Sequence, residues 1–365
     1  MAALAVGEPA IWRAVGPVLA IAAFLLSRPL QFKFDLVNVS VILFVVYVCL
    51  SWLWSVAPWV SFISAISYVS VAVAFITIRH AAATASAVRV IAFGYLLGCA
   101  YLVVRLISLS ISVAGEPIGG RLNLPGINAN YAGYALAAGF AVILLLWVTG
   151  PATRLFVAGY LVAGAFLTVG IMLAGARASL VALVALGLWV AITYFLRRPP
   201  LKALLVVVGV AFAVVISGIA DGSLFVFDDT ADRSTGGLSG RLDLWPLARS
   251  WWLDHFFVGS GTSSFQSSNP YYAGAHNLVL ELGTGLGIVG VVGFVLVVVV
   301  ALKRGNSFLV GGFIAVSTAS YLTGHWEAAP AAWVGLAIFS GSAVLNTRMP
   351  ARHHNRDAAR IDVGA

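Results

Sequence analysis

The feature that most constrains this fold is a series of apolar runs, each long enough to cross a lipid bilayer. A helix that spans a membrane needs roughly 17–25 predominantly apolar residues. Lipid offers the backbone no hydrogen-bond partners, so such runs have to be helical. The pattern predicts about eleven spanning helices, within a range of ten to twelve, at residues 11–27, 36–53, 60–78, 88–108, 130–148, 155–174, 178–196, 202–220, 277–301, 308–324 and 329–346.

The composition agrees with this pattern. Hydrophobic residues make up 61% of the 365-residue chain and charged residues only 9%, whereas soluble domains carry about 25% charged residues. We therefore expect an all-α fold, a polytopic transmembrane helical bundle that forms one integral membrane domain over residues 1–365. The cysteines Cys49 and Cys99 both lie inside apolar runs. They are expected to be small packing residues with no role in a disulfide or a metal site.

The basic residues indicate topology. The net charge is +8, and most Lys and Arg residues fall in short loops and in the tail at 347–365. Cytoplasmic loops of membrane proteins are enriched in these residues, so we take the charge as an orientation signal and expect no nucleic-acid partner. The tail is expected to be disordered and cytoplasmic. The opposite, extracytoplasmic side then receives residues 54–59, 114–129, 174–178, 221–275 and 324–329.

The N-terminal topology stays open at this stage. Counting eleven spans back from a cytoplasmic C-terminus puts the N-terminus outside, whereas Arg13 argues for the inside. We expect no removable signal peptide, because no short apolar segment with a small-residue cleavage site begins the chain.

The large loop at 221–275 is predicted to contain an amphipathic helix. Trp245, Ala248, Trp252 and Phe256 recur at helical spacing. Such a helix would rest on the outer leaflet, with Ser239 as its cap and Pro246 near its start. Arg241 and Asp243 at its N-terminal end are then placed to bind phosphate.

Two further arginines fall on the extracytoplasmic side, where cations are scarce. Arg121 precedes a Pro-Gly turn and the residues Asn128 and Asn130, of which Asn130 is a candidate N-cap for the next span. Arg177 lies in a tight loop at the outer interface. An arginine there either pairs with an anion or reaches lipid phosphates with its long side chain.

The end of the large loop carries a histidine at the start of an apolar run. His276 is followed by Asn277, and Glu281 lies four residues beyond Asn277 on the same helix face. A carboxylate in such a position usually faces the interior of the bundle. Gly283 and Gly287 would allow close packing of another helix.

Four segments in this order resemble the O-antigen ligase and polysaccharide polymerase family of bacterial membrane proteins. They are an Arg…Asn-x-Asn segment, a short arginine segment, a Gly-Arg…Trp segment and a histidine motif, at residues 121–131, 175–179, 239–245 and 276–290. The second departs from the family's Ser-Arg-Gly pattern, because Ala176 precedes the arginine. The likeness extends over roughly residues 36–346, and the family's usual twelve spans exceed the predicted count by one.

The resemblance implies a glycosyl transfer that inverts the anomeric carbon without a metal or cofactor. Arg177, Arg241 and Arg121 would hold the diphosphate of an undecaprenyl-diphosphate-linked glycan, and His276 would take the proton from an acceptor hydroxyl or position it. The acceptor would be a glycan or a glycolipid, at the outer face of the bacterial plasma membrane. Residue chemistry agrees, since arginine suits phosphate and histidine titrates near neutrality.

Three hypotheses remain. The first is a transferase, either a ligase or a polymerase, which no residue distinguishes. The second is a flippase or another transporter, which predicts broken helices and charges near the middle of the membrane, whereas most charges here lie at the ends of the runs. The third is a scaffold of an envelope assembly complex, which would need neither the outer arginines nor the histidine motif.

Overall fold

The computed structural model of the chain is a bundle of α-helices, and it describes residues 1–26, 34–112, 122–150, 153–196, 237–303, 305–324 and 326–341. These residues contain no β-strand, so the predicted all-α class is confirmed. The helices are α1 (Ala2–Gly7), α2 (Pro9–Leu26), α3 (Leu36–Leu50), α4 (Pro58–Ala81), α5 (Ala85–Ser112), α6 (Ala129–Thr149), α7 (Arg154–Ala174), α8 (Arg177–Leu196), α11 (Gly237–Asp254), α12 (Ser264–Ser268), α13 (Leu278–Leu302), α14 (Ser307–Thr323) and α15 (Pro330–Phe339).

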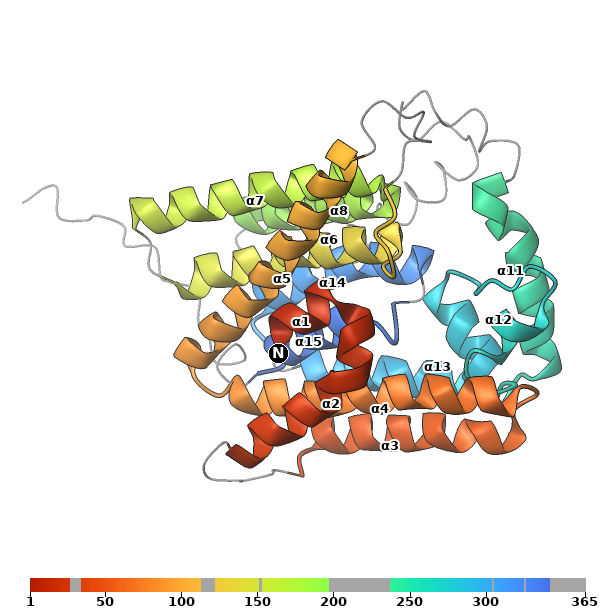
Figure 1. Cartoon of the computed structure of the whole chain (residues 1–365). Coiled ribbons are helices and arrows are strands. Elements are labelled where there is room, and N and C mark those ends of the chain that lie inside the picture. The colour runs from red at the N-terminus through yellow and green to blue at the C-terminus, as the bar shows by residue number, and fades with distance from the viewer. Residues whose placement is uncertain are drawn as a thin grey trace, which may run out of the picture.

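The long helices form two groups with α15 between them (Figure 1). On one side α6 packs against α5, α7, α8 and α14, and on the other α3 packs against α4 and α13. Every residue of α15 is buried, and this helix contacts members of both groups. A short, wholly apolar helix can be buried on all sides because its own backbone hydrogen bonds are satisfied.

Among the described residues, six helices are long and apolar enough to cross a membrane, by length and composition. They are α3 with its 3₁₀ extension to Trp54, α4, α5, α6, α7 and α13. The first part of α8 (Arg177–Thr193), α14 and α15 are shorter apolar helices. Each predicted run coincides with a helix except 202–220, which lies outside the described residues, as does the tail at 347–365. The chain is thus a multi-pass helical membrane protein, and the count of eleven spans stays a prediction.

The sequence pattern missed the first helix, α1. It packs against α5, and the residue after it, Glu8, forms an ion pair of 2.5 Å with Arg105 and accepts a hydrogen bond of 2.8 Å from the Tyr101 hydroxyl. Six residues are too few to show a helical period, which explains why the pattern gave no signal.

The described parts of the loops predicted to be extracytoplasmic meet at one end of the bundle. The amide of Val56 donates to Ser260 O over 3.0 Å, and the Ser61 hydroxyl donates to Thr262 O over 2.8 Å. At the same end, the Asn277 side-chain amide donates to Leu322 O over 3.1 Å. The first contact joins the loops at 54–59 and 221–275, which the charge pattern predicts to lie on one side. Their extracytoplasmic placement stays a prediction.

The helix predicted in the large loop is α11, but its start and surroundings differ from expectation. It begins at Gly237, so Ser239 lies inside the helix and is not its cap, and Pro246 is near its middle. Ala248 is fully buried, and Trp245 donates a 2.9 Å hydrogen bond to Ala275 O. Phe256 was expected in this helix but lies beyond its end at Asp254. The helix packs against α13, and its contact with the outer leaflet stays a prediction.

The predicted uninterrupted helix at 277–301 is broken at Gly287, which has φ 65° and ψ −167°. The freed backbone groups find other partners. Ile288 N donates to Phe256 O over 2.9 Å, and the Tyr47 hydroxyl donates to Leu286 O over 2.8 Å. Gly283 packs under the Trp252 ring of α11, as the expectation of close helix packing required.

Replacing Gly287 by Ala should destabilise the protein. A Cβ at this position would lie 2.3 Å from Phe257 O, on a backbone conformation that L-residues avoid. Strain of this kind costs about 1–3 kcal/mol, so the thermal midpoint in detergent should fall by several degrees.

Gly187→Ala is the matched control, because a Cβ there meets nothing within 4 Å. Alanine favours the helix at such a position by about 1 kcal/mol, so the midpoint should stay or rise. Equal midpoints for the two variants would contradict the strained turn at Gly287.

Candidate functional site

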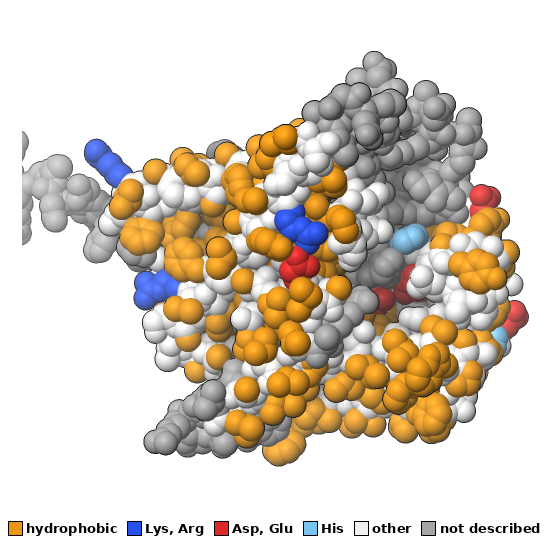
Figure 2. Space-filling model, viewed as in Figure 1, with side chains coloured by type: hydrophobic (Ala, Val, Ile, Leu, Met, Phe, Trp, Pro, Cys, Tyr) orange, Lys and Arg blue, Asp and Glu red, His pale blue; other side chains and the backbone are white. Residues whose placement is uncertain are grey.

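A cavity of about 470 Å³ opens at the end of the bundle where the loops predicted to be extracytoplasmic meet. Figure 2 shows a hollow on this face, with histidine and acidic side chains at it. The starts of α2, α4 and α6, the segment around α12 and the turn between α14 and α15 supply its walls. Its size falls within the range of roughly 300–1,000 Å³ that is usual for small-molecule sites.

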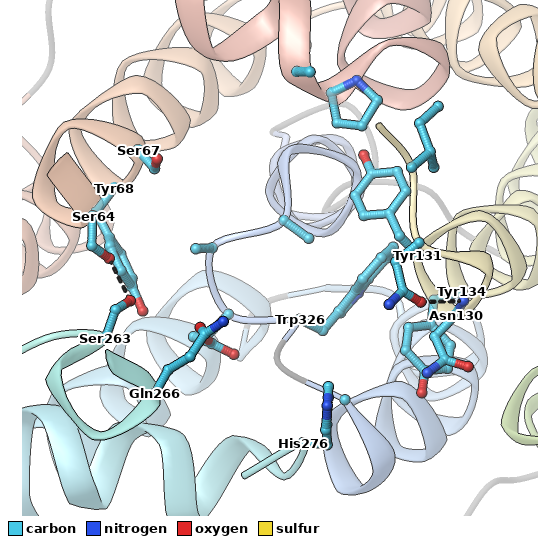
Figure 3. Close-up of a pocket in the computed structure, with 18 of the residues that line it drawn as sticks. Ser64, Ser67, Tyr68, Asn130, Tyr131, Tyr134, Ser263, Gln266, His276 and Trp326 are labelled. Carbon is cyan, nitrogen blue, oxygen red and sulfur yellow. Dashed lines mark hydrogen bonds between the residues drawn. The ribbon is translucent and has the colours of Figure 1, made fainter. Parts of the chain in front are cut away.

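His276 lines this cavity on the segment between α12 and α13 (Figure 3). Its backbone has φ 52°, in the left-handed region that residues other than glycine rarely adopt. Ser263, which also lines the cavity, has φ 59°. Such strain persists only where surrounding contacts enforce it, and it is often found at functional sites.

The start of α13 holds His276 in place. Asn277 is the N-cap, and its side-chain oxygen accepts hydrogen bonds from Val279 N and Leu280 N. Glu281 reaches back and accepts a 3.2 Å hydrogen bond from His276 N. Its carboxylate lies against Gly274, where a Cβ would be 2.3 Å from Oε1. The two predicted supporting residues therefore position the histidine backbone and do not line the cavity themselves.

Asn128 and Asn130 line the cavity where α6 starts. The N-cap of α6 is Asn128, whose side chain accepts a 2.8 Å hydrogen bond from Asn130 N. The expectation that Asn130 caps this helix is therefore wrong, because the helix begins one residue before it. Both asparagines line the cavity, as His276 does.

Sequence reasoning missed two residues of the turn between α14 and α15, Trp326 and Glu327. The Trp326 ring packs between Tyr131 and Tyr134, at centroid distances of 5.3 and 5.4 Å. Glu327 is 8% exposed, lines the cavity, and its Oε2 has no hydrogen-bond partner in the described structure. A carboxylate in a short turn between two apolar runs was the available signal.

The remaining wall carries hydroxyl groups from α4 and the segment around α12. Figure 3 shows Ser64, Ser67, Tyr68 and Ser263 on this side and the aromatic residues across the cavity. The Ser263 hydroxyl donates to Ser64 Oγ over 3.0 Å. Serines on an apolar helix gave no signal in the sequence, because single hydroxyls are common in spanning helices.

Burial raises the pKa of Glu327 above its ordinary value, and the charge of Glu281 raises it further. The two carboxylates therefore interact, and Glu327 favours its protonated form more strongly than an exposed glutamate does.

The predicted arginines do not line the cavity within the described residues. Arg177 is exposed at the first position of α8, and the start of α8 packs closely on α6, since a Cβ at Gly133 would lie 2.3 Å from the Cβ of Ala176. Asp243 is exposed on α11. Arg121 lies outside the described residues, and of Arg241 only the backbone, within α11, is described.

No group of three or more His, Cys, Asp or Glu side chains that could hold a metal ion occurs in the described part of the chain. Within it, the cavity combines an imidazole, a buried carboxylate, hydroxyls, amides and aromatic rings. These groups can accept a proton from a bound hydroxyl and hydrogen-bond a polar ligand.

Comparison with known proteins gives one finding. Residues 162–295 match the family model described as O-Antigen ligase. This stretch includes Arg177, Arg241 and His276 and ends before Glu327. No curated protein matches the chain. The resemblance seen in the sequence motifs is confirmed for residues 162–295.

Replacing Glu327 by Gln should stabilise the protein most at high pH. Folding raises the pKa of Glu327 above its ordinary value of 4.5. The contribution of Glu327 to the free energy of unfolding therefore decreases as the pH rises from 4.5 through the raised pKa. Gln keeps the shape without the charge. The thermal midpoint of the variant should exceed that of the wild type at about pH 9 and differ little at about pH 4. A gain that is the same at both pH values would contradict the proposed cause.

Proposed function

Because the chain carries an O-antigen ligase family domain at residues 162–295, we propose that it moves a glycan from undecaprenyl diphosphate to an acceptor hydroxyl. The family implies a membrane glycosyltransferase of the ligase or polymerase type. The finer assignment places the reaction at the outer face of the bacterial plasma membrane. The observation that carries it is His276, held on strained backbone in a cavity at the end of the bundle where the predicted extracytoplasmic loops meet.

In the proposed reaction His276 accepts the proton of the acceptor hydroxyl. The acceptor oxygen attacks the anomeric carbon of the donor sugar, and the bond from that carbon to the diphosphate oxygen breaks. The electron pair leaves with the diphosphate, and the anomeric carbon inverts. Asn277 and Glu281 support this step by fixing the backbone of His276.

The leaving diphosphate needs cationic partners, which the proposal assigns to Arg177, Arg241 and Arg121. Guanidinium groups carry a permanent charge and a fork of donors that matches phosphate oxygens. They stabilise charge as it develops on the leaving group, so neither a metal ion nor a cofactor is required by the proposal. Arg177 opens α8 and directly follows Ala176, which packs on α6 at Gly133. Gly133 is the neighbour in sequence of Tyr134, which lines the cavity.

A transporter is less well supported, although α13 is broken as in many transporters. The break at Gly287 does not line the cavity. Its backbone groups bond to the segment at 256–257 and to Tyr47. The cavity itself lies at helix ends and not near their middle. This arrangement favours chemistry at one membrane face over a path across it.

Replacing His276 by Asn should lower kcat by about 10²–10⁴, the usual contribution of a general base. Asn tolerates left-handed backbone better than most residues, so the local fold should persist. Transfer is measured with purified protein, lipid-linked glycan and acceptor. His255→Asn is the control, because His255 contacts Trp251 O outside the cavity. A fully active His276→Asn protein would refute the role of the histidine.

Replacing Arg177 by Ala should raise KM for the lipid-linked donor by about 10–100-fold, as expected for loss of a charged hydrogen bond. Arg154→Ala is the matched control, since Arg154 is also exposed and also opens a helix, α7, at the opposite end of the bundle. Similar KM values for the two variants would remove Arg177 from the donor site.

Ligase and polymerase activity differ in the acceptor, so the phenotype of a deletion strain separates them. Loss of a ligase should lead to accumulation of full-length lipid-linked chains, and loss of a polymerase to accumulation of single repeat units. Mass spectrometry of the extracted lipid-linked glycans measures both. Wild-type amounts of surface glycan in the deletion strain would contradict both assignments.

A further inference from the structure

The lining of the cavity is rich in neutral hydrogen-bonding groups. Its described residues include hydroxyls from α4 and from the segment before α12, side-chain amides and an imidazole. The groups are Ser64, Ser67, Ser263, Gln266, Asn128, Asn130 and His276. Some of these groups already bond within the protein, as the Ser263 hydroxyl does to Ser64. A ligand with many hydroxyls can add hydrogen bonds to such a polar lining, which an apolar ligand cannot do.

Glu327 is the lining group in greatest need of a partner. It is more than nine-tenths buried, and its Oε2 makes no hydrogen bond with any described residue. The turn that carries it is fixed, because Trp333 Nε1 donates to Glu327 O over 2.5 Å and Ala329 N donates to Trp326 O over 3.1 Å. A buried carboxylate oxygen without a partner is costly unless a ligand supplies a donor.

Aromatic rings border the same space. Tyr68 lies on the hydroxyl wall, and Tyr131, Tyr134 and Trp326 lie on the wall across from it (Figure 3). Such side chains combine an apolar body with a polar tip. A sugar ring has the matching character, with C–H faces and hydroxyl edges.

The charge of the cavity restricts which sugars fit. Glu327 faces the space, and the carboxylate of Glu281 lies behind His276. The described lining contributes neither Lys nor Arg. Burial raises the pKa of Glu327, so the site carries negative charge once the pH exceeds that raised value. A ligand carboxylate or phosphate then meets like charge in a partly desolvated site, which disfavours binding.

We infer that the cavity is a subsite for a sugar unit without an acidic group, in which Glu327 accepts a hydrogen bond from a hydroxyl or amino group of that sugar. The inference rests on the proposed function and deepens it, because it names the chemical class of the acceptor. Glu327 is here a residue that determines specificity, and the proton of the reacting hydroxyl still goes to His276.

The experiment measures binding without turnover. Full-length protein in lipid nanodiscs is titrated at about pH 9, above the raised pKa of Glu327. The ligands are methyl glucoside, methyl glucosaminide and the methyl glycoside of glucuronic acid, and binding is followed by saturation-transfer NMR. The glucuronide should bind at least tenfold more weakly than the two others. Glu327→Gln should weaken glucosaminide binding by about 10–100-fold. It should also reduce the difference in affinity between the glucoside and the glucuronide. Asp254→Asn removes an exposed acid on α11 and should change nothing.

Equal affinity for the glucoside and the glucuronide in the wild-type protein would overturn the inference. An unchanged ratio of these two affinities in Glu327→Gln would also overturn it, as would a failure of all three sugars to bind. The outcome is separate from the transfer assay. Selective sugar binding by a protein that transfers no glycan would leave the subsite standing and refute the transferase.

Discussion

Backbone groups in an apolar environment need partners within the protein, and the rest of this structure depends on that constraint. Inside the bundle the helices satisfy it by their own hydrogen bonds. Where α13 breaks at Gly287, the segment at 256–257 and Tyr47 take over the freed groups. At helix starts, side chains of Asp35, Asn128 and Asn277 accept the first amide hydrogens. Polar side chains are thereby drawn to helix ends, and at one end they surround a cavity.

The features that cost stability gather at that same cavity. His276 and Ser263 adopt left-handed backbone, and Glu327 keeps a buried oxygen without a partner in the described structure. Packing alone does not require any of these features, since a glycine or a neutral side chain would remove the cost. Natural proteins tolerate such departures mainly where function needs them. Their coincidence with the histidine of the ligase-like motif is the strongest structural argument for an active site here.

The positions of the long helices along the chain could be predicted from the sequence, because the length of an apolar run reports directly on the bilayer. Local detail could not. Whether Asn128 or Asn130 caps α6 depends on where the first turn closes, which composition does not encode. The break at Gly287 is invisible within an apolar run, since its partners come from a loop thirty residues earlier. Glu327 escaped notice because no pattern near it predicts its burial. The turn that carries it packs on α6, where the Trp326 ring contacts Tyr131 and Tyr134.

The described charges suggest how two substrates would be kept apart. Under the proposed assignment the donor carries a diphosphate and the acceptor a hydroxyl. The cavity presents Glu327 and, behind His276, Glu281, so a diphosphate would meet like charge inside it once Glu327 is ionised. Arg177 lies outside the described lining, exposed at the start of α8. The diphosphate is then favoured beside the arginines, and the acceptor is favoured within the cavity. The reacting hydroxyl and the anomeric carbon would therefore meet beside His276, which lines the cavity. The charges would thereby place the donor diphosphate on one side of His276 and the acceptor on the other.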